Sequence, residues 1–287
     1  MNVEQRYEAI DTALRGFAPQ LSGGEEYWLL IQTILTSQSR RGFVSDLALS
    51  PGQRVLDVGS GFGALAFDLA ATVPLDVTAC DTSDSVLAAA REMQRQILTA
   101  GALHSQSSVQ QVCADAYALP FGDAEYDVVI TRFLFQHLAE PIDALREIFR
   151  VLKPGGSCVV VDIDDQTILS YPVLSSAFSE LHGALAALQH KKGGDREVGR
   201  KLPLLFRRAG LRDVQIQIRP QSALAYVEDN DLSLQYSLLR FAQARSEIVE
   251  AGLLDPDAFD RHFEQLKTET GYWQFSSNAE FVVTGVK

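Results

Sequence analysis

Three glycines at alternate positions follow a short apolar segment in residues 55–63, which read Val-Leu-Asp-Val-Gly-Ser-Gly-Phe-Gly. Gly59, Gly61 and Gly63 let the backbone turn tightly and let another molecule approach the main chain. A helix beginning at Ala64 would direct its first N–H groups to the same place. The pattern predicts a strand, a binding turn and a helix, with a purely structural turn as the alternative. The G-x-G-x-G spacing differs from that of dinucleotide sites and favours a ligand without a pyrophosphate.

Apolar and small segments alternate after this turn in a regular order. Segments of strand length stand at 54–58, 76–80, 109–113, 127–130 and 157–163, and segments of helix length at 64–71, 83–100 and 141–151. Such alternation indicates βαβ units with right-handed crossovers. We therefore expect an α/β fold, with a mostly parallel sheet that carries helices on both faces.

The two ends of the chain follow other patterns. Apolar residues recur at helical spacing in residues 1–50, and Pro51-Gly52 then marks a turn. Toward the C-terminus we expect a helix at 201–209, a strand at 214–218, a largely helical insertion at about 221–270 and a final strand at 281–286. These patterns predict an N-terminal helical cap over 1–50 and one main domain over 51–287.

The charge of the chain bears on its partners. Acidic residues outnumber basic ones, 37 to 25, which gives a formal net charge of −12, and basic clusters such as Arg40-Arg41 are no longer than two residues. Proteins that bind nucleic acids usually present a basic face, because counterion release from phosphates drives that binding. A nucleic-acid partner is therefore disfavoured.

Cysteine usage and hydropathy bear on the compartment. Cys80, Cys113 and Cys158 are widely spaced and form neither a disulfide framework nor a zinc spacing. The first residues lack the features of a signal peptide, and no apolar run is long enough to span a bilayer. We expect buried free thiols, no structural metal, no membrane association and a cytoplasmic location.

Acidic residues follow the second and third expected strands at their tips. Asp81 ends the segment Val77-Thr78-Ala79-Cys80, where a carboxylate can accept hydrogen bonds from the two hydroxyls of a ribose. Its alternative role is to cap the next helix, which Thr82, Ser83 or Asp84 can also do. Asp115 can accept from an exocyclic amine such as that of adenine, while Ala116 donates its N–H to the ring. An exposed turn acid is the alternative for Asp115.

Six stretches carry a resemblance to a known family: residues 55–63, Asp81, 115–121, 126–129, 135–138 and 152–156. In this order and spacing they resemble the motifs of class I S-adenosylmethionine-dependent methyltransferases. The likeness is to the small-molecule branch that includes the ubiquinone/menaquinone C-methyltransferases and many natural-product enzymes, and it covers about residues 40–165. The resemblance implies a Rossmann-like, doubly wound, seven-stranded sheet whose last strand is antiparallel and lies between strands five and six.

The resemblance also implies a set of cofactor-binding residues. They are Arg41, Asp57, Gly59, Ser60, Gly61, Gly63, Asp81, Thr82, Asp115, Ala116, Thr131 and Arg132. The stretch from Asp57 to Gly63 would border the methionine part of S-adenosylmethionine, and Thr131-Arg132 would lie beside the sulfonium. Ser60 stands where many relatives have cysteine. Arg40 or Arg41 would meet the cofactor carboxylate, unless both are surface arginines.

The methyl acceptor is less constrained by the sequence. His137 follows the fourth strand, where the acceptor should lie, and is the candidate base; the alternative is a wall residue. Asp162, Asp164 and Asp165 could bind a cation or act as a base, but Thr131-Arg132 occupies the place of the carboxylate that metal-dependent relatives need. Tyr7, Tyr27 and Trp28 would cover the site as a lid or simply pack on the core. Aromatic residues in the insertion suggest a partly apolar acceptor.

The sequence thus predicts methyl transfer from S-adenosylmethionine to an O, N or C atom of a small metabolite, leaving S-adenosyl-L-homocysteine. The partner would be a small-molecule acceptor, and an oligomer is possible. One alternative is a binding module, or a non-methylating enzyme that retains the S-adenosylmethionine pocket. Another is a methyltransferase that acts on proteins.

Overall fold

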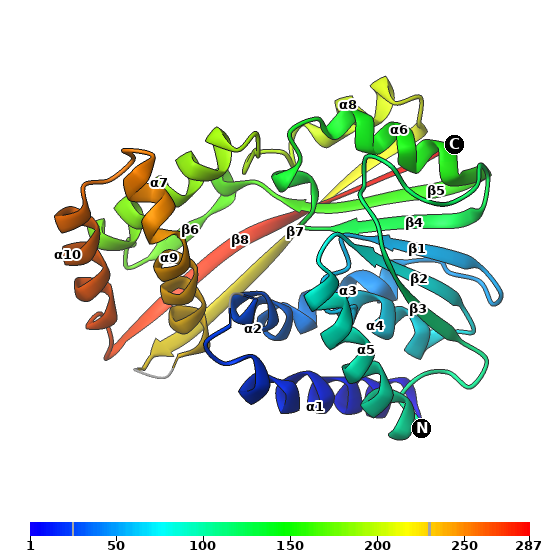
Figure 1. Ribbon diagram of the computed structural model, residues 1–287, viewed down its shortest axis with the longest axis horizontal. Coiled ribbons are helices and arrows are strands. Elements are labelled where there is room, and N and C mark those ends of the chain that lie inside the picture. Colours follow the sequence, from blue (N-terminus) through cyan, green and yellow to red (C-terminus); the bar gives the residue numbers. More distant parts are fainter. Residues whose placement is uncertain (25, 229–230) are drawn as a thin grey trace.

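The computed structural model describes residues 1–24, 26–228 and 231–287 (Figure 1). Within these residues an eight-stranded sheet has the order β3-β2-β1-β4-β5-β8-β6, and β7 pairs with β8 off this path. The strands of the parallel part are β1 (Arg54–Val58), β2 (Asp76–Asp81), β3 (Ser108–Cys113), β4 (Tyr126–Arg132) and β5 (Leu152–Ile163). Each expected strand of this part is confirmed to within a few residues, except that β5 begins at Leu152 and not at residue 157.

The last strand runs against its neighbours, as the resemblance implies. β8 (Tyr272–Val286) is antiparallel to β5 on one side and to β7 (Arg212–Val227) on the other. The sheet has one strand more than the seven expected, because the short β6 (Leu169–Tyr171) pairs with the part of β8 that extends past β5.

Helices cover both faces of the sheet (Figure 1). On one face lie α6 (Pro141–Val151) and α8 (Leu202–Arg208), whose buried residues cluster with Leu56, Val129 and Val160. On the other face lie α4 (Ala64–Thr72), α5 (Asp84–Thr99) and the N-terminal helices. Strands buried on both sides explain why the β1 segment is almost continuously apolar. The doubly wound arrangement is confirmed.

The N-terminal segment forms three helices: α1 (Val3–Leu21), α2 (Tyr27–Leu35) and α3 (Ser37–Asp46). Ile10, Leu14 and Phe17 of α1 are buried in the same cluster as Val55 of β1 and Phe67 of α4. The cap is therefore part of the main core, and α2 reaches across to α9 (Leu232–Glu250).

A helical lobe stands at the end of the sheet where β7 and β8 continue past β5 (Figure 1). We use this name for α7 (Ser176–Lys191), α9 and α10 (Pro256–Lys267) together with the outer halves of β7 and β8. Phe241, Ile248 and Phe259 are among the residues of its separate hydrophobic cluster.

The predicted helical insertion needs a correction at its start. Residues 221–227 belong to β7, and the helices occupy 232–250 and 256–267. The apolar alternation of Ile216 and Ile218 resumes at Leu224 and Tyr226, and these residues pair with β8, which itself begins at residue 272 and not at 281. A period of two predicts a strand, and here it continues past Pro220.

The cysteines are free, and Cys80 and Cys158 are buried as expected. Cys113 is exposed instead, because it ends β3, the edge strand of the parallel part. Across the residues that the structure describes, every helix is too short or too polar to cross a bilayer.

Candidate active site

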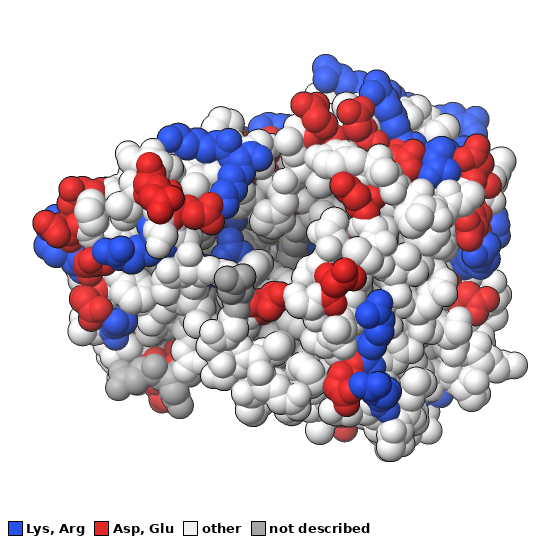
Figure 2. All heavy atoms as spheres, in the orientation of Figure 1, with Lys and Arg blue, Asp and Glu red and all other residues white. Residues whose placement is uncertain are grey.

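A cavity of about 320 Å³ opens at the carboxyl ends of β1, β2 and β4. Figure 2 shows the molecule hollowed between the helical lobe and the sheet. The predicted residues that line the cavity are Asp57, Gly59, Ser60, Gly61, Asp81, Arg132 and His137, joined by Trp28, Leu29, Gln32, Thr33, Thr36 and Arg40 of the N-terminal helices. Ligands bind at this edge of doubly wound sheets because the loops after the strands meet there.

The glycine turn has a backbone that favours glycine at each expected position. Gly59, Gly61 and Gly63 have φ angles of 74°, 52° and 73°. The N–H groups of Gly59 and Ser60 donate to the carbonyl of Cys80 at 2.8 and 2.9 Å, which anchors the turn to the end of β2. A side chain at Gly59 would meet Leu134 at 3.0 Å. Gly63 does not line the cavity but begins α4 as its N-cap.

Asp81 is held in place by two backbone amides. One carboxylate oxygen accepts from Gly61 N at 2.9 Å, and the other accepts from Ser83 N at 3.1 Å. Ser83 itself caps α5, so the alternative role of Asp81 as helix cap is filled by its neighbour. Each carboxylate oxygen can accept more than one hydrogen bond, which leaves Asp81 capacity toward the cavity.

Asp57 is fully buried beneath the turn, and its Oδ2 has no partner among the described residues. Burial and the nearby charge of Asp81 raise the pKa of Asp57 to about 7. A carboxylate in this position favours a positively charged or hydrogen-donating group in the cavity beside it.

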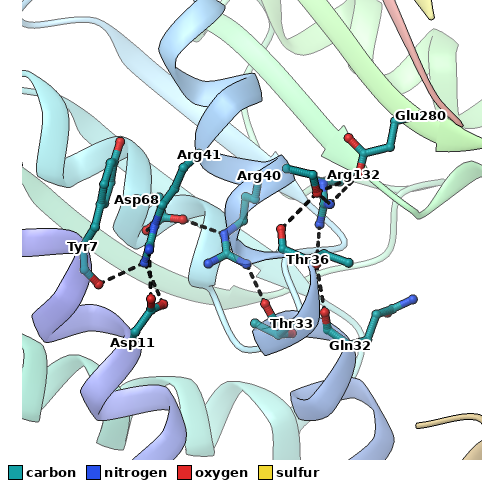
Figure 3. Close-up of polar contacts among 11 residues, drawn as sticks. Tyr7, Asp11, Gln32, Thr33, Thr36, Arg40, Arg41, Asp68, Arg132 and Glu280 are labelled. Atoms are coloured by element: carbon teal, nitrogen blue, oxygen red, sulfur yellow. Dashed lines mark hydrogen bonds and ion pairs between the residues drawn. The ribbon is translucent and has the colours of Figure 1, made fainter. Parts of the chain in front are cut away.

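Two arginines follow each other in α3 but have different environments (Figure 3). Arg40 lines the cavity, donates to Asp68 at 2.6 Å and to the carbonyl of Thr33 at 2.8 Å, and keeps one nitrogen, Nη2, without a partner among the described residues. Arg41 stacks on Tyr7 and donates to Asp11 at 2.7 Å, outside the cavity lining. The structure therefore points to Arg40 where the sequence pointed to Arg41.

Arg132 ends β4 at the floor of the cavity (Figure 3). It forms an ion pair of 2.7 Å with the buried Glu280 of β8 and donates to Thr36 and Ser39 at 3.1 and 2.9 Å. Its neighbour Thr131 is fully buried, is not part of the lining, and has an Oγ1 without a partner among the described residues.

The remaining predicted residues lie beyond this cavity. Asp115 is exposed and accepts from Tyr117 N at 2.9 Å, while Ala116 is buried beside it. Thr82 is exposed at the tip of β2. The backbone bond of 3.0 Å from Ala114 N to the carbonyl of Asp81 places this group next to the tip of β2. The structure thus groups the methionine and ribose candidates in one cavity and leaves the adenine candidates outside it.

His137 ends a 3-10 turn (Phe135–His137) and lines two cavities at once. The second has a volume of about 210 Å³ and also shares Trp28 with the first. Enclosure by protein and the positive charges of Arg240 and Arg196 lower the pKa of His137 to about 4, although the residue as a whole is exposed to solvent. Its imidazole is therefore neutral near pH 7.

The acids that close β5 are engaged by protein groups. Asp162 accepts from Ile163 N at 2.8 Å and from Gln136 N at 3.2 Å, Asp164 pairs with Arg200, and Asp165 pairs with Arg196. Across residues 1–24, 26–228 and 231–287, no group of three His, Cys, Asp or Glu side chains is arranged to hold a metal.

Sequence reasoning missed Glu280 and Arg240 as site residues. Glu280 lies in an apolar strand, and Arg240 follows two leucines in a helix. A charged residue within an apolar segment indicates a buried partner or a cavity, and this signal could have found both residues. Trp28, expected as a lid or packing residue, lines both cavities, whereas Tyr7 and Tyr27 line neither.

Comparison with known proteins gives a consistent picture. Residues 56–160 match the model of a methyltransferase domain. The O-methyltransferase cnsE of Penicillium expansum is 30% identical over 209 residues, which cover 71% of each chain. The ubiquinone/menaquinone biosynthesis C-methyltransferase UbiE of Cereibacter sphaeroides is 34% identical over 133 residues, or 46% of this chain and 50% of that protein. The match thus spans about half the length of the UbiE relative.

A solved structure shares the fold at lower identity. Phosphoethanolamine N-methyltransferase 2 of Haemonchus contortus, in complex with S-adenosyl-L-methionine, has a TM-score of 0.54 and 20% identity. The alignment covers 96% of this chain and 60% of that one. With the sheet order, the glycine turn and the relative matched over more than two thirds of both chains, the chain belongs to the class I S-adenosylmethionine-dependent methyltransferases.

Proposed function

We propose that this protein transfers a methyl group from S-adenosylmethionine to an O, N or C atom of a small organic acceptor and releases S-adenosyl-L-homocysteine. The observation that carries the proposal is the unpartnered Oδ2 of the buried Asp57, beneath a turn whose glycines permit close approach. The α-ammonium group of the cofactor would supply the missing donor.

Other residues of the cavity suit the remaining polar groups of the cofactor. The free Nη2 of Arg40 is a partner for its α-carboxylate, and Asp81 is a partner for its ribose hydroxyls. The exposed Asp115 and the buried Ala116 would serve the adenine ring from the neighbouring strand tip. The charges on these side chains match a zwitterionic amino acid joined to a nucleoside.

When bound, S-adenosylmethionine would supply an electrophilic methyl carbon, which the acceptor atom attacks in line with the breaking C–S bond, so that S-adenosyl-L-homocysteine leaves as a neutral thioether. The protein contributes orientation and exclusion of water. Arg132 is fixed by Glu280 at the floor, and Trp28 lines both this cavity and the second one. His137 stands between the two cavities, and with a pKa of about 4 it serves as a neutral hydrogen-bond partner of the acceptor and is a weak base.

The cofactor site is tested by calorimetry with S-adenosyl-L-homocysteine. Asp81→Ala should weaken binding by on the order of 1–3 kcal/mol, the cost of removing a charged hydrogen-bond partner. The matched control is Asp84→Ala, which removes an exposed acid three residues away in α5 and should leave the affinity unchanged. Equal affinity of wild type and Asp81→Ala would refute the ribose assignment.

The reaction is tested with methyl-labelled S-adenosylmethionine and an extract of the producing cell. The proposal predicts label in a small molecule other than S-adenosylmethionine. Label on protein would favour a protein-modifying enzyme, and binding without transfer would favour a module that retains only the pocket.

A further inference from the structure

The second cavity, of about 210 Å³, has apolar and polar walls, the polar part including the Lys192–Glu247 ion pair, and it adjoins the proposed cofactor site. Leu185 and Leu188 of α7 and Ala244 of α9 form an apolar wall. Trp28 and His137 form the boundary that it shares with the first cavity. An acceptor in this space would lie directly against the cofactor site.

Arg240 of α9 lines this cavity and lacks the partner that neighbouring cations have. Arg132 pairs with Glu280, Arg196 with Asp165 and Lys192 with Glu247. By contrast, no carboxylate among the described residues forms an ion pair with Arg240. Its protein contacts are the ring of Trp28, whose centre is 4.1 Å from the guanidinium carbon, and the side chain of Tyr236.

An arginine so enclosed is costly without an anion, because burial penalises an uncompensated charge. Enclosure and the nearby Arg196 lower the pKa of Arg240 from its ordinary value. The positive charges of Arg240 and Arg196 also act on His137, which lines the same cavity, and help to lower its pKa. Figure 2 shows basic side chains on the lobe side of the hollow, in keeping with this field.

We propose that Arg240 recognises the methyl acceptor, and that the acceptor is an organic acid whose carboxylate pairs with this guanidinium. The inference rests on the proposed function, since it assigns the second cavity to the acceptor. The planar guanidinium can donate two parallel N–H bonds to a carboxylate, and stacking on Trp28 fixes its plane. The apolar body of the acid would lie along Leu185 and Leu188.

The test compares 2-naphthoate with its neutral analogue 2-naphthamide by calorimetry on the full chain saturated with S-adenosyl-L-homocysteine. Naphthoate should bind the wild type at least about ten-fold more tightly than the amide, the effect of one charged hydrogen-bond pair. Arg240→Gln should abolish this preference. Arg240→Lys, which keeps the charge without the planar fork, should retain part of it, and unchanged affinity of Arg240→Gln for S-adenosyl-L-homocysteine shows that its loss of preference is not misfolding.

The matched control is Arg245→Gln on the same helix. The side chain of Arg245 is 40% exposed and pairs with Asp260, and it does not line the second cavity, so its loss should leave the preference unchanged. Equal affinity of the wild type for the two probes, no binding of either, or a preference that survives in Arg240→Gln overturns the inference. These outcomes differ from failure of the proposed function, because that failure appears as a wild type that does not bind S-adenosyl-L-homocysteine or that transfers no labelled methyl group to a small molecule.

Discussion

At the scale of single residues, the site is marked by polar side chains that lack a hydrogen-bond partner for one atom, or an ion-pair partner, among the described residues. Within the part of the chain that the structure describes, Asp57 and Arg40 each have one buried atom without a hydrogen-bond partner, and Arg240 has no ion-pair partner. In a folded interior such groups are usually paired. Their positions therefore indicate which charged groups a bound ligand would bring to the site.

The buried carboxyl group of Asp57 should make the free energy of unfolding depend on pH, which can be measured. Its pKa is raised from 3.8 to about 7, so the folded state holds a proton that the unfolded state has lost. The stability that this provides is fully present below pH 3.8 and is lost as the pH rises to about 7. Relative to wild type, Asp57→Asn should therefore gain about 2–3 kcal/mol between pH 5 and pH 8.

Urea denaturation of the protein without cofactor, at both pH values, measures this gain. Asp76→Asn is the control, because Asp76 is exposed at the start of β2. A stability difference between Asp57→Asn and wild type that does not change with pH would contradict a raised pKa. S-adenosyl-L-homocysteine should stabilise the wild type more than the variant at pH 8, since its ammonium group needs the charge.

Some of these site residues could be predicted from the sequence, because the residues next to them in the chain identify them. Asp57 precedes the glycine turn by two residues and Asp81 ends the next apolar segment, so local spacing was sufficient to find them. Glu280 and Arg240 contact residues far away in the chain, as Glu280 does with Arg132, and no local pattern names such a partner. The choice between Arg40 and Arg41 depended on which side of α3 faces the cavity, which two adjacent letters cannot tell.

At the scale of elements, β8 joins the parts of the molecule. It pairs with β5 and β7, and its Glu280 meets Arg132 at the end of β4 and Ser39 in α3. The parallel strands were predictable because apolar runs and turns alternate in the sequence. The outer halves of β7 and β8 were missed because Pro220 and the polar residues around it resemble a break, and their pairing across 272–286 is not a local property.

The Arg132–Glu280 pair should be a major contribution to this junction. Glu280→Ala leaves the buried Arg132 without its carboxylate and should reduce the free energy of unfolding by about 3–5 kcal/mol. The control is Arg219→Ala, which breaks the more exposed pair with Asp46 at the position facing Glu280 and should cost about 1 kcal/mol or less. Similar losses for the two variants in urea denaturation would rule out a special role for the buried pair.

At the scale of the whole molecule, the N-terminal cap packs against both the sheet and the lobe. α1 is buried in the core of the sheet, and α2 packs on α9 of the lobe. We therefore propose that the chain unfolds as one unit, although the sequence suggests a cap over 1–50 and a domain over 51–287.

The two tryptophans report on this cooperativity from different parts. Trp28 lies in α2, and Trp273 lies in the outer half of β8. In the single-tryptophan variants Trp28→Phe and Trp273→Phe, fluorescence should follow denaturation curves that coincide with the far-ultraviolet circular dichroism of the same protein. A fluorescence transition of Trp273 that precedes the circular dichroism would show that the lobe unfolds separately.

Trp28 and His137 lie between two cavities that are lined by different segments of the chain. The first cavity, which we propose holds the methyl donor, is lined by the N-terminal helices, the glycine turn and the ends of β2 and β4, whereas the second, which we propose holds the acceptor, is lined largely by α7 and α9 of the lobe. On this proposal, substitutions on those two helices would alter which compound is modified while the methyl source stays the same. A fold arranged in this way can diversify its chemistry by exchanging one partner of the reaction at a time.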